Sequence, residues 1–244
     1  MPRARRRSIG TLRHMPGSGP DADPERFVPL RDPRPDDVVW PELAWPIAPD
    51  VSLVGSTVRL DRLDPATDAS AVFAALDHPQ VWAHLPISPT SVDDYTAFLT
   101  GLATRPGWHT WVVRLERELA GLARGAIVGT TSFLDAHVGD AGVEIGATAY
   151  TPPAWGTAVN PECKLLLLGH AFDEMAAGRV QIKTDIRNAR SQQAIARLGA
   201  RFEGVLRRHY RRSDGTVRDT VMFSITVEEW PAVRRGLQAR LADT

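Results

Sequence analysis

The sequence predicts a mixed α/β fold in which helices cover both faces of one central sheet. Two observations lead to this prediction. From residue 57 onward, segments with the period-two alternation of strands interchange with segments of helical spacing. Most of the expected helices also begin at a residue type that caps helices well. A mixed sheet between layers of helices accommodates this order of elements.

The first half of the regular region contains four expected strands and two expected helices. Asp64-Pro65 predicts the start of a helix, because proline fits the first helical position. Ser91 with Asp94 three residues later predicts a second helix start. The expected strands are residues 58–63, 109–115, 126–134 and 143–150.

Two further helices flank a short strand in the second half. Asn160 is expected to cap a helix that carries Pro161 in its first position. Residues 180–184 alternate as a strand. Asn188 is then expected to cap a shorter helix that ends at Gly199.

A hairpin and a terminal helix complete the pattern. Residues 205–211 and 217–227 alternate as strands, and Asp214-Gly215 between them is a strong turn signal. The last helix follows Glu228. The chain therefore ends in two neighbouring antiparallel strands covered by a helix.

The composition is that of a globular protein without a strong overall charge. Of 244 residues, 43% are hydrophobic and 24% charged, and 29 Lys and Arg balance 29 Asp and Glu. A balanced charge gives no general attraction to nucleic acid. No apolar run approaches the roughly 20 residues of a membrane span, so neither nucleic acid nor a membrane is an expected partner. Cys163 is the only cysteine, which excludes an intramolecular disulfide and suits a cytoplasmic protein.

The first 50 residues differ from the rest of the chain. They are rich in Pro, Asp and Arg, so residues 1–50 are expected to form an extended or partly disordered arm, and residues 51–244 a single domain. The apolar segment 40–47 is expected to pack on that domain or on a second subunit. A monomer and a homodimer both remain open. The arginines near residue 5 either contact nucleic acid or are simply solvated.

The most informative segment joins an expected strand to a helix through a loop of small residues. Gly156, Thr157 and Ala158 lie between the strand 143–150 and the helix near Asn160. Consecutive backbone N–H groups at a helix start form an anion site suited to a diphosphate. Many loops of this kind bind nothing, so the loop alone does not establish a site.

The wider pattern resembles a known family. Glu144-Ile145-Gly146, the Trp-Gly loop, Asn188-Ala189-Arg190-Ser191 and Leu198-Gly199-Ala200-Arg201-Phe202-Glu203-Gly204 follow one another in this order. The segment is similar to the GNAT superfamily of N-acetyltransferases, in particular to the ribosomal-protein-alanine acetyltransferases. The resemblance implies a mostly antiparallel sheet, acetyl-coenzyme A as the acyl donor, a primary amine as the acceptor, and no metal.

The resemblance also implies where the donor binds. The loop would hold its diphosphate, and the strand 143–150 would splay from its neighbour to receive the pantetheine arm. A backbone N–H near Ala147 would stabilise the oxyanion. Donor-binding residues implied in this way are Ala147, Trp155, Gly156, Thr157, Ala158, Val159, Asn160, Asn188 and Ser191.

Three side chains are candidates for the chemistry. Glu144 is either the general base or a carboxylate that pairs with an arginine; strand alternation would put Glu144, Gly146 and Thr148 on one face. His209 is either a base or a structural histidine, and the base proposed in related enzymes aligns most closely with Tyr210. Ser191 is either the proton donor to the departing thiolate or an ordinary helix serine.

Three loop positions depart from the family pattern and leave alternatives open. Trp155, Ala158 and Asn160 occupy loop positions that usually hold Gln or Arg, Gly, and Gly or Ala. Asn160 is bulkier than the usual residue. A module that binds acyl-coenzyme A without catalysis, or an interaction surface on the same fold, is therefore an alternative to an active transferase. Lys183 and Arg187 either steer phosphates or line a solvated edge.

Overall fold

A computed structural model of the chain describes residues 28–32, 40–85 and 87–243. The chain divides into two compact units, residues 1–38 and 39–244, and all elements described below belong to the second. The strands are β1 (Leu53–Val54), β2 (Val58–Arg62), β3 (His109–Leu115), β4 (Ile127–His137), β5 (Gly142–Tyr150), β6 (Arg179–Asp185), β7 (Arg201–Arg211) and β8 (Val217–Thr226). The helices are α1 (Pro65–Leu76), α2 (Pro79–Trp82), α3 (Val92–Ala103), α4 (Val159–Gly169), α5 (Ala189–Ala196) and α6 (Trp230–Ala242).

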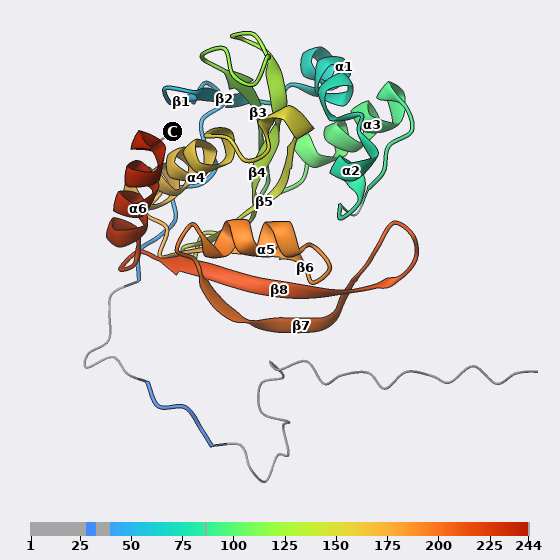
Figure 1. The fold of residues 1–244 in the computed structure, drawn as a ribbon. Coiled ribbons are helices and arrows are strands. Elements are labelled where there is room, and N and C mark those ends of the chain that lie inside the picture. Colours follow the sequence, from blue (N-terminus) through green and yellow to red (C-terminus); the bar gives the residue numbers. More distant parts are fainter. Residues whose placement is uncertain (1–27, 33–39, 86, 244) are drawn as a thin grey trace, which may run out of the picture. The chain divides into compact units, whose positions relative to one another are not determined.

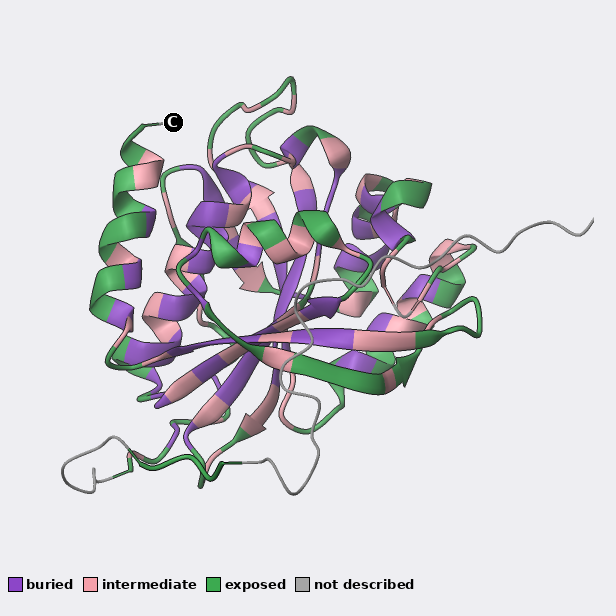
Figure 2. Ribbon diagram, turned by 60° about the horizontal axis from the view of Figure 1, so that its bottom comes forward, coloured by how far each residue is buried: buried purple, intermediate pink, exposed green. Residues whose placement is uncertain are grey.

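All these strands form one mixed sheet in the order β1-β2-β3-β4-β5-β6-β8-β7. Only β5 and β6 are parallel, and the other neighbours are antiparallel. The long β7–β8 hairpin forms one edge of the sheet (Figure 1), and β7 is exposed along most of its length (Figure 2). The expected mixed, mostly antiparallel sheet with helices on both faces is confirmed.

Two hydrophobic cores lie on opposite faces of the sheet. The first contains apolar residues of α4, α5 and α6 together with Trp111 and Val113 of β3. The second contains residues of α1, α2 and α3 together with Val112 of β3. Successive residues of β3 thus belong to different cores, as expected for a strand whose side chains alternate between the two faces of the sheet. We call the α1–α3 side the front face and the α4 side the back face.

Three helix starts agree with the sequence. The side chain of Asp64 accepts a hydrogen bond from Ala66 N, that of Ser91 from Asp94 N, and that of Asn188 from Ser191 N. Each side chain satisfies one N–H group of a first turn that has no partner within its helix.

The predicted start of α4 is wrong by two residues. Its N-cap is Ala158, whose carbonyl already accepts from Glu162 N, so Asn160 and Pro161 lie within the first turn. Proline is tolerated there because its missing N–H would have no acceptor inside the helix. The N-cap Ala158 has no side chain that could cap the helix, and only the N–H of Val159 is taken, by Thr157 Oγ1 at 3.3 Å.

The apolar segment before β1 packs on the domain. Leu43 and Ile47 are 2% and 9% exposed and belong to the core of the back face. Ala44 N donates to Met175 O at 2.8 Å, which fixes the segment further. Most of the expected arm, including its arginine cluster, lies outside the described residues, and its boundary at residue 50 stays a prediction.

Candidate active site

The sheet opens between its two parallel strands. Pairing of β5 with β6 ends at Glu144 and Gln181. Beyond this point β6 stays paired with β8 up to Asp185, while β5 continues along β4 to Tyr150. The edge of β5 that faces β6 therefore has no strand partner after Glu144. Backbone groups on such an edge are available to a ligand.

A β-bulge reshapes β5 at this opening. The β4–β5 register shifts between Thr130 and Ser132, and Ala147 has a φ of +45°. The extra residue turns Thr148 to the back face, where its hydroxyl lies 2.8 Å from the hydroxyl of Thr131. The alternation that would put Glu144 and Thr148 on one face is therefore wrong.

Gly146 stays on the front face with Glu144, close to its carboxylate. A Cβ at Gly146 would lie 2.7 Å from both Glu144 Oε1 and Leu134 Cδ1. Such a contact is too close for a carbon atom, so a larger residue would require the ends of these side chains to shift. Glycine at this position thus leaves room for the Glu144 carboxylate.

Glu144 is a buried carboxylate that pairs with a lysine. Its side chain is 2% exposed, and Oε2 lies 2.7 Å from Lys183 Nζ and 3.1 Å from Gln181 Nε2. Burial raises the pKa of Glu144, although the Lys183 ammonium opposes this. Burial alone would lower the pKa of Lys183, but its attraction to Glu144 and its hydrogen bonds raise it. A buried carboxylate with a raised pKa beside an opening is a typical proton acceptor.

Lys183 connects this carboxylate to Tyr210. Its Nζ donates to Tyr210 Oη at 3.1 Å and lies 3.8 Å from Asp135 Oδ2. With its side chain only 13% exposed, Lys183 does not line a solvated edge. The sequence did not reveal this role, because it depends on the register of the parallel pair β5–β6.

His209 neighbours Tyr210 and does not contact Glu144. The two rings lie 4.0 Å apart between centroids, and Nδ1 of His209 is buried without a hydrogen-bond partner in the described chain. Burial, with the charges of Lys183 and Arg218, lowers the pKa of His209. This histidine therefore favours its neutral form.

The loop before α4 presents free amides. Within the described residues, no acceptor is found for the backbone N–H groups of Gly156, Thr157, Ala158 or Asn160. Gly156 adopts a φ of +75°, a conformation that glycine takes without strain. Amides of this kind at a helix start can hold a phosphate group.

An arginine lies over this loop that sequence reasoning had not singled out. The guanidinium carbon of Arg190, on α5, lies 3.5 Å from the ring centroid of Trp155. Trp155 is itself held by a hydrogen bond from Nε1 to Tyr150 O at 2.8 Å. The two side chains thus join the starts of α4 and α5 across the opening.

The other predicted residues of α5 lie at its first turn. Asn188 Oδ1 accepts from Ser191 N at 3.0 Å, so its carbonyl serves as the cap. Ser191 is half-buried, and its hydroxyl makes no contact with Glu144 or Lys183. Ile195, where many superfamily members have a tyrosine, is 5% exposed and packs in the core.

Both lysines of the chain are withdrawn from the surface. Lys164 is 4% exposed, and its Nζ donates to Thr148 Oγ1 at 3.1 Å. Burial lowers the pKa of Lys164 to about 8.

The neighbouring Glu162 accepts backbone hydrogen bonds from Ser56, Thr57 and Val58, so it secures the turn between β1 and β2.

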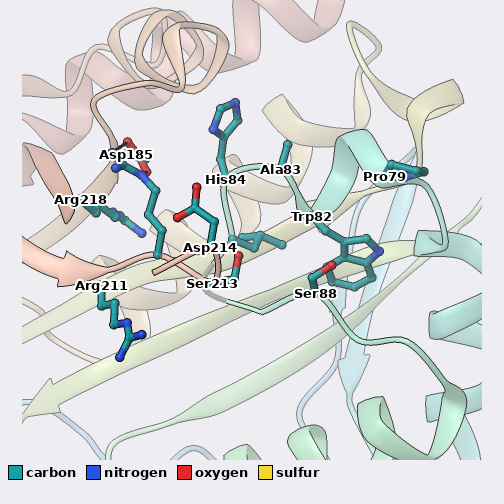
Figure 3. Close-up of a pocket in the computed structure, with 12 residues that line it drawn as sticks. Pro79, Trp82, Ala83, His84, Ser88, Asp185, Arg211, Ser213, Asp214 and Arg218 are labelled. Carbon is teal, nitrogen blue, oxygen red and sulfur yellow. Dashed lines mark hydrogen bonds and ion pairs between the residues drawn. The ribbon is translucent and has the colours of Figure 1, made fainter. Parts of the chain in front are cut away.

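A cavity of about 230 Å³ lies on the front face (Figure 3). Trp82 and His84 line it from α2 and the following loop, and the β7–β8 hairpin lines it from the other side. Arg218, one of its lining residues, has its guanidinium carbon 5.3 Å from the ring centroid of Tyr210. The described residues contain no group of three or more His, Cys, Asp or Glu that could hold a metal ion. None of their helices is long and apolar enough to cross a membrane.

Comparison with known proteins identifies the family. Residues 57–201 match the family model of the acetyltransferase (GNAT) domain. This match covers more than half of the chain, so the protein belongs to the GNAT acetyltransferase family. No curated protein matches the chain.

Solved structures agree with this assignment. A protein from T. thermophilus, provisionally described as an acetyltransferase, is 38% identical with a TM-score of 0.71, over 81% of this chain and 100% of that chain. A GCN5-related N-acetyltransferase from Brucella melitensis is 24% identical with a TM-score of 0.75, over 83% and 89%. Mycobacterium smegmatis RimJ, solved in complex with CoA-disulfide, is 22% identical with a TM-score of 0.63, over 75% and 88%. The last two likenesses show the fold alone.

Proposed function

We propose that this protein is an N-acyltransferase that moves an acetyl or related acyl group from acyl-coenzyme A to a primary amine by direct attack on the thioester. One observation carries the proposal. Glu144, a buried carboxylate with a raised pKa, lies at the point where β5 loses its pairing with β6. A proton acceptor thus adjoins a backbone edge that is free to bind the donor.

The residues of this chain fit the coenzyme. The free amides of Gly156, Thr157, Ala158 and Asn160 suit a diphosphate, because they add to the positive end of the α4 dipole. Arg190 adds a positive charge that the loop lacks, since Trp155 stands where the family usually has Gln or Arg. The free edge of β5 suits the amide groups of a pantetheine arm. The RimJ structure contains a coenzyme A derivative, in keeping with this assignment.

Glu144 would act as the base. An amine attacks only when neutral, so the ammonium form loses its proton to Glu144, directly or through a water molecule. The amine nitrogen then forms a bond to the thioester carbonyl carbon, the carbon–sulfur bond breaks, and the nitrogen loses a second proton, which balances the proton that the thiolate takes up. The backbone N–H of Ala147, on the bulge, would stabilise the oxygen that gains negative charge.

The departing thiolate needs a proton, and two groups compete for that role. Ser191 lies at the first turn of α5, and Tyr210 lies on the other side of Lys183. His209 remains a second candidate for the base, with Tyr210 beside it. Products are the amide and free coenzyme A thiol.

The finer parts of the proposal concern the biological setting. We expect a cytoplasmic enzyme, monomeric or homodimeric, with an arm before residue 51 and one catalytic domain after it. A relation to the ribosomal-protein-alanine acetyltransferases would make a protein N-terminus one possible acceptor. No nucleic acid and no membrane is expected as a partner.

An acceptor panel tests the proposal. Release of thiol is measured with acetyl-, propionyl- and succinyl-coenzyme A against amino acids, polyamines and peptides. We expect release that depends on both the donor and an added amine. Because neither lysine is exposed, acetylation of the protein itself gives little background signal. Calorimetric binding of coenzyme A without turnover would favour a non-catalytic module, and absence of binding would favour an interaction surface.

A further inference from the structure

The cavity on the front face has an excess of positive charge. Three arginines line it, Arg211, Arg212 and Arg218, against two carboxylates, Asp185 and Asp214. Both carboxylates are already engaged by the protein. Asp185 holds Arg212 in a two-pronged ion pair, with Nε–Oδ2 at 2.6 Å and Nη2–Oδ1 at 2.8 Å.

The second carboxylate belongs to the hairpin turn. Oδ1 of Asp214 accepts from the backbone N of Thr216 at 2.8 Å and from its hydroxyl at 2.7 Å. Arg211 and Arg218 have no ion-pair partner among the described residues. Only Arg218 of these two lies on the front face, because Arg211 is paired with Val217 and therefore points to the opposite face of the hairpin, where its guanidinium approaches Gly215.

Arg218 is the better placed of the two. It is half-buried on β8, and its one hydrogen bond within the described chain runs from Nε to Thr220 Oγ1 at 3.2 Å. A guanidinium has five N–H donors, so the others remain for a ligand. Burial lowers the pKa of Arg218, since attraction to Asp185 does not offset its loss of solvation. A carboxylate or phosphate would match its planar donors.

The position of Arg218 links the cavity to the proposed base. Its guanidinium carbon lies 5.3 Å from the ring centroid of Tyr210, and Lys183 Nζ lies 5.4 Å from the same centroid. Lys183 in turn pairs with Glu144. Tyr210 and Lys183 thus lie between Glu144 and an anionic group bound to Arg218.

We propose that the acceptor is a small primary amine that carries a carboxylate or phosphate group, with the anionic group bound by Arg218 and the amine directed toward Glu144. This inference rests on the proposed acyl transfer. The volume of about 230 Å³ equals roughly eight water molecules in the liquid, which suits a small molecule better than a folded partner. Trp82 supplies an apolar wall for its carbon chain.

Matched acceptors test the anion requirement. β-Alanine is compared with β-alaninamide, and O-phosphoethanolamine with ethanolamine, with rates corrected for the fraction of neutral amine. We expect kcat/KM to be at least tenfold higher for one anionic member than for its uncharged partner. The first pair tests for a carboxylate and the second for a phosphate. Equal kcat/KM values within both pairs would overturn the inference.

Variants assign the effect to the cavity. Arg218→Gln should remove the preference, mainly through KM, and Arg218→Lys should restore part of it. Arg211→Gln, on the opposite face of the same hairpin, is a neighbouring control and should retain the preference. Arg235→Gln, exposed on α6, is a second control and should also retain it. A preference that survives Arg218→Gln contradicts the site.

Failure of the proposed reaction can be told apart from failure of this site. If no amine supports thiol release, calorimetry with β-alanine and O-phosphoethanolamine in the presence of coenzyme A still measures the site. If these compounds bind and Arg218→Gln abolishes the binding, the anion site is supported and the proposed reaction is rejected. No binding of either compound would reject the site. A peptide acceptor preferred over a small amine of equal charge would overturn the small-molecule assignment.

Discussion

Glu144 and Lys183 form an ion pair across the two parallel strands of the sheet, with Oε2 and Nζ 2.7 Å apart. The pair lies where the strands begin to separate, because Glu144 is the last residue of β5 that pairs with β6. Lys183 also donates to Tyr210. The carboxylate is thus paired with a cation, buried and close to a free backbone edge, an arrangement that suits a general base at this opening.

Replacing the carboxylate should remove most of the activity. Glu144→Gln keeps the shape and can still accept from Gln181, but it cannot take a proton from the amine. Loss of a general base lowers rates by about 10²- to 10⁴-fold. We expect kcat to fall within that range and the dissociation constant of acetyl-coenzyme A to stay within threefold, as measured by steady-state kinetics and calorimetry.

Glu203→Gln is the control for this substitution. Glu203 pairs with Arg179 and accepts from Ser224, at a partly exposed site of the β7 edge. Its loss should leave kcat unchanged. Full activity of Glu144→Gln would show that another group removes the proton, and His209→Ala would be the next variant.

Lys183 should set the pH dependence of the reaction. Its ammonium opposes the rise in the pKa of Glu144 that burial causes. Lys183→Met removes this opposition, so the pKa of Glu144 rises further and the acidic limb of kcat/KM moves to higher pH. Lys183→Arg keeps the charge and should return the limb toward its original position. If the acidic limb of kcat/KM does not move in Lys183→Met, the group that titrates in this limb is not under the influence of Lys183.

Local signals in the sequence were sufficient for much of the fold. Asp64, Ser91 and Asn188 each accept the first-turn hydrogen bond that their position predicts. A cap depends on residues only two or three positions apart, so it can be recognised in a single sequence. The mostly antiparallel character of the sheet, and the opening beside β5, followed from the resemblance to the family.

The arrangement of the site depended on features that sequence patterns do not contain. The bulge at Ala147 reverses the side-chain direction beyond it, yet alanine gives no signal for a positive φ. The Glu144–Lys183 pair follows from a parallel register that no local rule specifies. The contact of Arg190 with Trp155 joins two helix starts far apart in the chain. Tertiary register, rather than propensity, determines each of these features.

Arg190 should strengthen binding of the coenzyme diphosphate. Arg190→Gln removes a positive charge beside the free amides of the loop. We expect the dissociation constant of coenzyme A to rise about tenfold, equal to about 1.4 kcal/mol, and to depend less on salt. S-Acetylpantetheine, which lacks the diphosphate, should bind both proteins equally. Arg197→Gln, exposed at the end of α5, is the control, and a tenfold effect there would contradict the assignment.

Glu162 should stabilise the fold without taking part in the reaction. Its two carboxylate oxygens accept from Ser56 N, Thr57 N and Val58 N at 2.7–2.9 Å. Glu162→Ala leaves these amides without acceptors, and unsatisfied buried groups cost about 1–3 kcal/mol each. We expect urea denaturation to show a loss of about 3 kcal/mol, with kcat retained at low temperature. Glu118→Ala, in an exposed loop, should change neither quantity.

Lys164 should make stability depend on pH in the alkaline range. Burial lowers its pKa from 10.5 in the unfolded chain to about 8 in the folded protein. Below pH 8 the lysine is charged in both states, and the fold bears the full penalty of a buried charge. Between pH 8 and 10.5 the unfolded chain binds more protons than the folded protein, so stability rises with pH and the penalty disappears.

Lys164→Met removes both the charge and its titration. Lowering the pKa of Lys164 from 10.5 to about 8 corresponds to about 3 kcal/mol, reduced by about 1 kcal/mol for the lost hydrogen bond to Thr148. The variant should therefore be more stable than the parent by about 2 kcal/mol at pH 7, and this advantage should vanish as the pH approaches 10. Comparing the two proteins by urea denaturation cancels the groups that titrate in both. A difference that stays constant from pH 7 to 10 would mean that Lys164 is not a buried ammonium, and that its side chain reaches solvent instead.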